Sequence, residues 1–345
     1  MANRRDDVKG GSMQMRDFGM NGPKVGAIGF GAMSFGGFYG AADDAESQRA
    51  LAACLDTATT HWDTSDVYGF GKSEEMIGQF FRENPGARAK VHLATKGGIK
   101  RRPGTTERVF DNSAEYLRGT LDASLKRLGV DHVDCYYVHR REGERPIEEV
   151  AATMAALIKE GKIRGYGLSE VAPWSVKRAH AVHPVTAVQN EYSLWTRLPE
   201  LGLLQTCRDL GIAFVAFSPV ARGMFAGTVS TNTEFGKFDF RRGNPRFTEP
   251  NFSANLRAVE PFHAFAKARG VTGAQLALAW LLTRGDHIIP IPGTRFAGRV
   301  KENAVAAEIK LSAADLAEID RLLPIGFQHG ARYSDFQQIG SELYG

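Results

Sequence analysis

Four side chains capable of proton chemistry follow short apolar runs in the first half of the chain. Asp63 ends one run, Tyr68 lies five residues further on, and Lys96 and His139 directly follow the next two runs. An ammonium beside a phenol stabilises the phenolate, so we expect Lys96 to lower the pKa of Tyr68. Asp63 would keep Lys96 charged and in place. With the imidazole of His139, this set could protonate a carbonyl oxygen as negative charge develops on it.

Reduction of a carbonyl also needs a hydride, which no side chain supplies, so a cofactor is implied. Near residue 290 the chain offers a candidate site for it, in a predicted turn and the helix that follows. The residues are Gly293, Thr294, Arg295, Arg299, Glu302 and Asn303. Exposed N–H groups at a helix start, a hydroxyl and two arginines form an anion site. The extra positive charge suits the 2′-phosphate of NADP(H) rather than NAD.

Eight short apolar runs, separated by stretches with helical periodicity, supply the elements that must position these residues. The runs lie at 25–30, 60–63, 90–95, 133–138, 164–168, 186–189, 212–217 and 287–291. Short, poorly alternating runs are typical of strands buried on both faces. Helices are expected at 44–58, 113–128, 146–160, 174–182, 199–210, 256–269, 273–283 and 296–307.

Eight strand–helix units predict an α/β fold, a single-domain (β/α)8 TIM barrel with its chemistry at the carboxyl ends of the strands. A doubly wound dinucleotide-binding sheet would need G-x-G-x-x-G after the first strand. The chain reads Gly29-Phe30-Gly31-Ala32-Met33-Ser34 there, without the third glycine. The polar segment 223–255 is predicted to be a long loop over the active site. The C-terminal tail, 322–345, would either cap the barrel or extend into solvent.

Composition excludes several other classes of protein. The 345 residues carry a net charge of only +4, so neither nucleic acid nor a membrane surface is expected as a partner. Three widely spaced cysteines do not form a disulfide framework, which favours a reducing compartment. Residues 1–11 lack the apolar core of a signal peptide, and no apolar run reaches 18 residues, so we expect a cytoplasmic protein. No metal site is predicted, since His180 and His183 lack a third ligand at a suitable spacing.

The motifs IGFGAMSFGG, WDTSDVYGFGKSEEMIG, VHLATKGG, DHVDCYYVHR and IPGTRFAGRVKEN occur in this order. Over residues 15–307 the chain resembles the aldo-keto reductases. The pairing of GLSE with AVQNEYSLWTR resembles the long-loop bacterial and plant branch that reduces varied aldehydes and ketones. The resemblance implies hydride transfer from NADPH to a small-molecule carbonyl. It also implies Tyr68 as general acid, Lys96 and Asp63 as its tuning pair, and His139 as the group that orients the carbonyl.

The same resemblance implies further cofactor contacts. Ser169 and Gln189 match positions that bind the nicotinamide carboxamide, and Phe217 matches the aromatic ring that stacks on nicotinamide. Ser218 and Arg222 match the stretch along the pyrophosphate, and Thr294, Arg299, Glu302 and Asn303 match the adenosine and 2′-phosphate site. Glu170 stands where many members have Asn, Phe217 where many have Tyr, and Gly293 where some have Lys. Because Glu can still accept a hydrogen bond and Phe can still stack, we expect cofactor binding to survive.

The motifs leave two properties of the protein unspecified. A nucleotide-sensing regulatory subunit with slow turnover, built on the same barrel, would carry the same four residues as a reductase. The oligomeric state is not encoded in any of these motifs.

Overall fold

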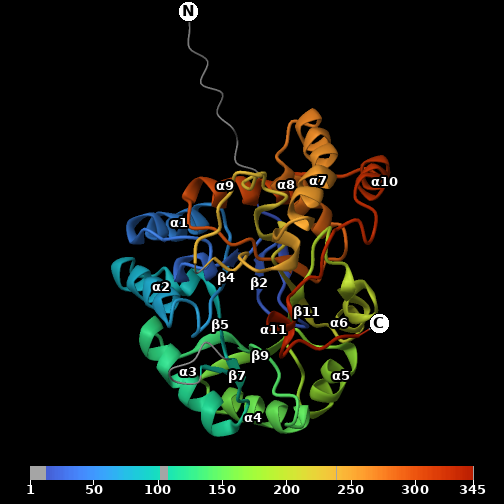
Figure 1. Ribbon diagram of the computed structural model, residues 1–345. Helices are drawn as coiled ribbons and strands as arrows, with labels where there is room; N and C mark the ends of the chain where they lie inside the picture. Colours follow the sequence, from blue (N-terminus) through green and yellow to red (C-terminus); the bar gives the residue numbers. More distant parts are fainter. Residues whose placement is uncertain (1–12, 102–107, 238, 345) are drawn as a thin grey trace, which may run out of the picture.

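Eight parallel strands form a barrel at the centre of the molecule, in the order in which they follow along the chain (Figure 1). The computed structural model describes residues 13–101, 108–237 and 239–344. The barrel strands are β3 (Phe30–Gly31), β4 (His61–Asp63), β5 (His92–Gly97), β8 (Val133–Val138), β9 (Ile163–Ser169), β10 (Ala187–Glu191), β11 (Ala213–Phe217) and β12 (Ile288–Pro290). Gly31 bridges to Gly293, and the Gly29 N–H donates to the Pro290 carbonyl oxygen over 2.9 Å, which joins the first strand to the last. The predicted barrel is confirmed.

Helices surround the barrel, and three more are added to this ring. The ring consists of α1 (Asp44–Asp56), α2 (Lys72–Glu83), α3 (Ala114–Leu128), α4 (Ile147–Lys159), α5 (Pro173–Val182), α6 (Leu203–Asp209), α8 (Gly273–Leu282) and α9 (Ala297–Val305). The additional helices are α7 (Asn251–Ala268), α10 (Ala313–Leu322) and α11 (Asp335–Gln338). None of the helices among the described residues is long and apolar enough to span a membrane.

Several predicted boundaries were wrong for local reasons. The helix expected from residue 199 begins at Leu203, because Pro199 lies in a short 3-10 turn and Gly202 adopts a left-handed φ of 98°. The expected long loop 223–255 is shorter than predicted, because α7 begins at Asn251. Helix α2 was not predicted, although Met76, Ile77 and Phe80 give it a buried face at helical spacing.

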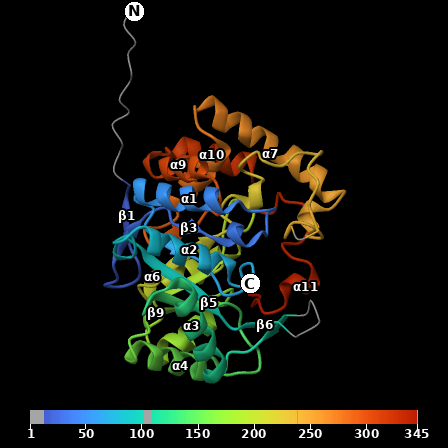
Figure 2. The ribbon, with the colours of Figure 1, turned by 90° about the vertical axis from the view of Figure 1, so that its left-hand side faces the viewer.

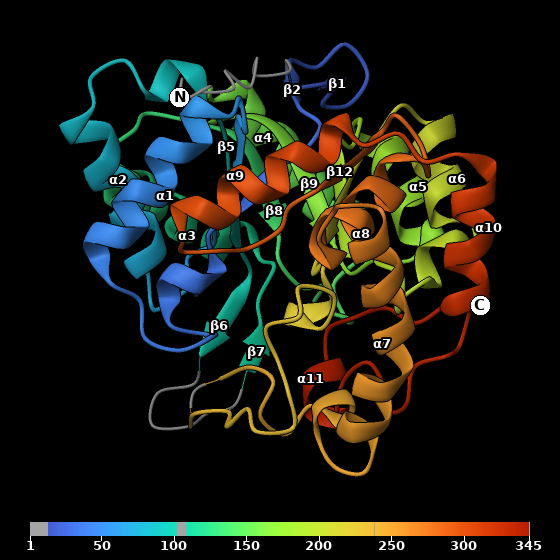
Figure 3. The same cartoon turned by 90° about the horizontal axis from the view of Figure 1, so that it is seen from above.

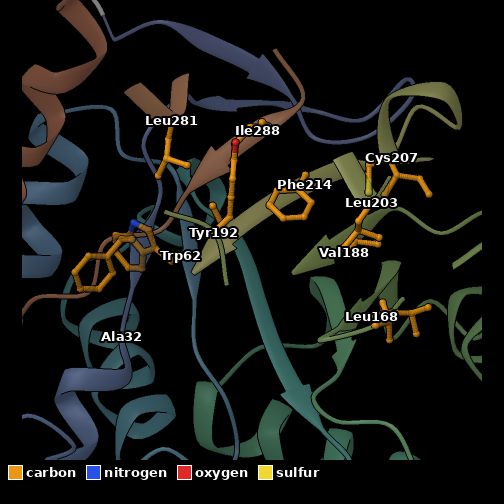
Figure 4. Packing of buried hydrophobic residues seen from close by; sticks show 14 of the residues in the cluster. Ala32, Trp62, Leu168, Val188, Tyr192, Leu203, Cys207, Phe214, Leu281 and Ile288 are labelled. Atoms are coloured by element: carbon orange, nitrogen blue, oxygen red, sulfur yellow. The ribbon is translucent and has the colours of Figure 1, made fainter. Parts of the chain in front are cut away.

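Along each barrel strand, side chains point alternately into the barrel interior and toward the surrounding helices. The interior contains Ala94, Cys135, Tyr137, Ala187, Ala213, Val215 and Ile289. Their neighbours, among them Val188, Phe214 and Ile288, pack against the helices (Figure 4). A Cβ on Gly167 would lie 2.3 Å from the Tyr137 ring, so glycine there lets the ring fill the interior. Since residues two apart face the same way, Lys96, His139 and Gln189 come to the carboxyl end of the interior.

A β-hairpin closes the amino end of the barrel. It consists of β1 (Met15–Asp17) and β2 (Lys24–Gly26), which pair antiparallel. The run predicted as one strand at 25–30 is therefore divided between this hairpin and β3. Between the two hairpin strands, Phe18 is fully buried with its ring 4.7 Å from that of His61 and 4.1 Å from that of His92. In Figure 2 the hairpin and α11 lie at opposite ends of the molecule.

The C-terminal segment returns to the carboxyl end of the barrel and joins the segment before α7. Asn244 donates to the Arg332 carbonyl oxygen over 2.9 Å and to the Gln337 side chain over 3.1 Å. Asn255 and His329 exchange two hydrogen bonds through the Asn255 side chain. Figure 3 shows α11 beside the start of α7. A second hairpin, of β6 (Ile99–Arg101) and β7 (Arg108–Phe110), follows β5 at this same end of the barrel (Figure 2).

Candidate active site

A buried ion pair lies at the carboxyl end of the barrel interior. The Lys96 ammonium donates to an Asp63 carboxylate oxygen and, over 2.8 Å, to the Thr64 carbonyl oxygen. The Lys96 side chain is completely buried. Burial alone would lower the pKa of Lys96, but the charges of Asp63 and Tyr68 outweigh it and raise that pKa. Lys96 is therefore a cation held in place from two sides.

Tyr68 lies in the loop after β4 with its hydroxyl 3.5 Å from the Lys96 ammonium. The edge of the Phe38 ring approaches its ring, at 5.9 Å between centroids. Burial raises the pKa of Tyr68, and the charge of Lys96 offsets this only in part. The expectation of a lowered pKa was wrong, because sequence shows the neighbouring cation but not the loss of water around the phenol. Tyr68 is protonated at neutral pH, which is the form that a general acid needs.

His139 completes the group of four. Its ring is nearly perpendicular to that of Tyr68, at 5.8 Å between centroids. Its Nδ1 lies 3.0 Å from the hydroxyl of Ser65, which fixes the ring from the side of the β4 loop. The sequence reasoning missed Ser65, although it lies within the same motif, two residues after Asp63. The structure thus brings Asp63, Tyr68, Lys96 and His139 together around one small volume.

Three of the expected cofactor residues occupy inward positions on the next strands. Gln189, on β10, donates to the second Asp63 oxygen over 2.8 Å. Ser169, at the end of β9, accepts a hydrogen bond from Arg140 over 3.2 Å. Phe217, at the end of β11, is partly buried against the interior cluster. Ser169 pairs directly with Gln189 across β9 and β10, and Phe217 lies two residues beyond Val215, the partner of Gln189 on β11.

The expected residues Glu170 and Arg222 belong to a buried charge cluster that sequence alone did not reveal. Arg222 donates to a Glu191 oxygen over 2.7 Å, and Arg332 donates to Glu170 over 2.6 Å. Ser218 and Arg222 both have left-handed φ values, 50° and 55°, so the chain after β11 turns sharply. Glu191 and Arg332 had not been predicted. Arg332 could not have been, since it lies 162 residues from its partner.

Buried donors in this region fit an anionic ligand. Nε and Nη1 of Arg222 are buried and have no acceptor among the described residues. A buried guanidinium with unsatisfied N–H groups is unfavourable unless a further acceptor reaches it. A phosphate oxygen is such an acceptor, and the fork of N–H groups on arginine matches it well.

The remaining expected residues lie together after β12. Thr294 is buried, and its hydroxyl accepts from the Phe296 N–H over 3.1 Å just before α9. The guanidinium groups of Arg295 and Arg299 lie 4.9 and 5.0 Å from the centre of the Phe296 ring. Asn303 lines the same small cavity as Thr294. Glu302 directly precedes Asn303 on α9, and Gly293 is exposed beside β3. This cluster presents two arginines at the start of a helix, as an anion site requires.

The barrel and the four side chains at its carboxyl end define an enzyme of the α/β-barrel class. The model of the aldo/keto reductase family matches residues 27–324. The chain therefore belongs to the aldo/keto reductase family and is an oxidoreductase.

Curated relatives cover nearly the whole chain. It is 43% identical to the aldo-keto reductase yakc [NADP(+)] of Schizosaccharomyces pombe, over 90% of this chain and 92% of that protein. It is 39% identical to the probable aldo-keto reductase 1 of Glycine max, over 91% of this chain and 90% of that protein.

Solved structures share the fold at 28% sequence identity. The glycerol dehydrogenase AKR11B4 from Gluconobacter oxydans matches with a TM-score of 0.79, over 92% of this chain and 96% of that one. An aldo/keto reductase from Klebsiella pneumoniae, in complex with NADP and acetate, matches with a TM-score of 0.69, over 92% and 98%.

Proposed function

We propose that this protein reduces aldehydes or ketones to alcohols, with NADPH as the cofactor and Tyr68 as the general acid. The observation that carries the proposal is the buried Lys96, which joins Asp63 on one side and the Tyr68 hydroxyl on the other. A relative and a solved neighbour are named with NADP, which supports the choice of cofactor.

The protein side chains would divide the proton chemistry among them. NADPH, when bound, supplies the hydride that no side chain can provide. Tyr68 is protonated before reaction and donates its proton to the carbonyl oxygen. Lys96 then stabilises the phenolate, and Asp63 keeps Lys96 charged and immobile. His139, fixed by Ser65, would orient the carbonyl toward the Tyr68 hydroxyl.

The cofactor would extend along the carboxyl end of the barrel. Its nicotinamide would lie against Ser169, Glu170, Gln189 and Phe217, of which Gln189 bonds to Asp63 and pairs with Ser169. The unsatisfied donors of Arg222, next to Ser218, would bind the pyrophosphate. The adenosine and its 2′-phosphate would lie at Gly293, Thr294, Arg299, Glu302 and Asn303. These assignments follow the resemblance to the aldo/keto reductases, and the buried donors of Arg222 support the pyrophosphate contact.

We further propose that the segments 223–255 and 322–345 form the wall of the carbonyl site and set its specificity. The Phe240 N–H donates to the Phe38 carbonyl oxygen over 2.9 Å, and Phe38 touches Tyr68. Tyr333, from the C-terminal segment, packs edge-on against Phe240 at 6.3 Å. We place the chain in the long-loop bacterial and plant branch because of its GLSE and AVQNEYSLWTR motifs.

The direct test is NADPH oxidation by the pure protein with a panel of aldehydes and ketones, run in parallel with NADH. We expect turnover of at least one aldehyde with NADPH and weaker turnover with NADH. No turnover above background across the panel would refute the reductase. Tight NADPH binding with very slow turnover of every carbonyl would instead favour a nucleotide-sensing subunit.

A further inference from the structure

The C-terminal segment contributes a guanidinium to the charge cluster beside the proposed nicotinamide site. Arg332 lies between two carboxylates, 2.6 Å from Glu170 and 3.8 Å from Glu191. Arg222 donates to the same Glu191 oxygen over 2.7 Å, and the second oxygen accepts from the Thr196 hydroxyl over 3.1 Å. Both carboxylates are almost completely buried, so each needs a compensating charge. Proton transfer as proposed above uses none of these four groups.

Glu170 depends on Arg332 for its compensating charge. One Glu170 oxygen accepts from the Glu191 N–H over 3.0 Å, and the other accepts from Arg332. Burial opposes ionisation, but the charges of Arg332 and Arg140 lower the pKa of Glu170 to about 2. Glu170 is therefore an anion at every working pH, neutralised by a residue from the far end of the chain.

The position of Glu170 links this charge to the cofactor site. It directly follows Ser169, and its N–H donates to the Gln189 carbonyl oxygen over 3.0 Å. Its φ of 56° is uncommon outside glycine, and its carbonyl oxygen accepts from the Glu342 N–H over 2.9 Å. The C-terminal segment therefore contacts Glu170 twice, through its carboxylate and through its carbonyl oxygen. Glu170 in turn lies next to Ser169 and Gln189, the two proposed carboxamide contacts.

We propose that Arg332 is a positioning residue that sets the relative affinity for oxidised and reduced cofactor, by neutralising Glu170. The oxidised nicotinamide ring carries a positive charge and the reduced ring carries none. An unpaired carboxylate near this ring would attract the oxidised form selectively, whereas the Glu170–Arg332 pair has no net charge. Arg332 therefore favours the reduced cofactor, which a carbonyl reductase must bind before each turnover. This inference rests on the NADP(H) binding proposed above.

The test measures dissociation constants for NADP⁺ and NADPH at pH 8 by quenching of intrinsic fluorescence, without a carbonyl substrate. In Arg332→Met we expect the ratio of Kd for NADPH to Kd for NADP⁺ to rise at least fivefold. Arg332→Lys keeps the charge and should restore the ratio to within twofold of wild type. In the Glu170→Gln background, Arg332→Met should change the ratio less than twofold, because no carboxylate is left to neutralise.

A purely structural role would give a different pattern. Glu342 docks the same segment through Arg141, Ser175 and the Ala172 N–H without touching the Glu170 side chain. Glu342→Gln should therefore weaken both cofactor forms by the same factor and leave the ratio unchanged. An unchanged ratio in Arg332→Met, or an equal shift with Glu170→Gln present, would overturn the inference. Failure of the wild type to bind either form would instead refute the proposed function.

Discussion

Replacement of Lys96 by Met separates what this residue does for stability from what it does for catalysis. Met preserves most of the side-chain length and removes the charge. The change deletes the hydrogen bonds to Asp63 and to the Thr64 carbonyl oxygen and leaves a buried carboxylate without its partner. Loss of one partner of a buried ion pair costs about 3–5 kcal/mol. We expect the free energy of unfolding, measured with urea, to fall by that amount.

The catalytic effect follows from the distance between the Lys96 ammonium and the Tyr68 hydroxyl. At 3.5 Å, a full charge on each and an effective dielectric constant of about 20 give an attraction of roughly 5 kcal/mol as an upper value. Only part of this attraction is gained in the transition state, so we expect kcat to fall by about 10²- to 10⁴-fold.

A second substitution distinguishes the two effects. Asp63→Asn removes the buried charge that Lys96→Met leaves unpaired, and it keeps an oxygen that can accept from Gln189. The double variant should recover most of the lost stability while kcat stays low. Recovery of kcat together with stability would refute the reasoning, because it would mean that Lys96 acts only by holding the fold together. Unchanged kcat in Lys96→Met would refute it as well.

Three further predictions concern cofactor preference, pH and packing. Arg299→Ala should raise the Kd for NADPH by about 10- to 100-fold and leave that for NADH nearly unchanged, as measured by fluorescence titration; equal weakening of both would show that Arg299 does not bind the 2′-phosphate. Burial lowers the pKa of His92 to about 4, against 6.5 for an ordinary histidine, so between these pH values the unfolded chain binds the additional proton. The free energy of unfolding should therefore decrease by about 3 kcal/mol from this group as the pH falls from 6.5 to 4, and urea titrations of His92→Gln should lack that component. Gly167→Ala places a Cβ 2.3 Å from the Tyr137 ring and should destabilise the protein by about 1–3 kcal/mol, whereas Gly119→Ala, within α3 and with no atom within 4 Å of the new Cβ, should stabilise it slightly. Equal unfolding midpoints for the two alanine variants would contradict the packing argument.

The sequence predicted the barrel and the proximity of the four candidate residues because both depend on local patterns. A buried parallel strand reads as a short apolar run, and the polar residue that ends it lies at the carboxyl end of the barrel. Asp63 is the last residue of such a run, and Lys96 and His139 directly follow the next two. Closure of the barrel then brings the ends of neighbouring strands together without any further information from the sequence.

The remainder of the site depends on contacts between distant segments and on burial. No local pattern indicates that Arg332 binds Glu170, because the two lie in unrelated motifs. The direction of the pKa shift of Tyr68 depends on how much water the surrounding segments exclude, which the residue types alone do not determine. The run 25–30 is divided because its start pairs with β1, whereas its end pairs with β4 in the barrel. A strand in either place would be equally apolar, so the apolar pattern does not distinguish the two.

In the proposed mechanism Tyr68 donates the proton, and Tyr68→Phe tests this role most directly. The variant loses only the hydroxyl, and the ring can still pack against Phe38. We predict that kcat for aldehyde reduction falls by at least about 10²-fold, while the Kd for NADPH stays within twofold of wild type. Retention of most of kcat would contradict the assignment of Tyr68 as general acid, and an equal loss of NADPH binding would show that its hydroxyl is structural.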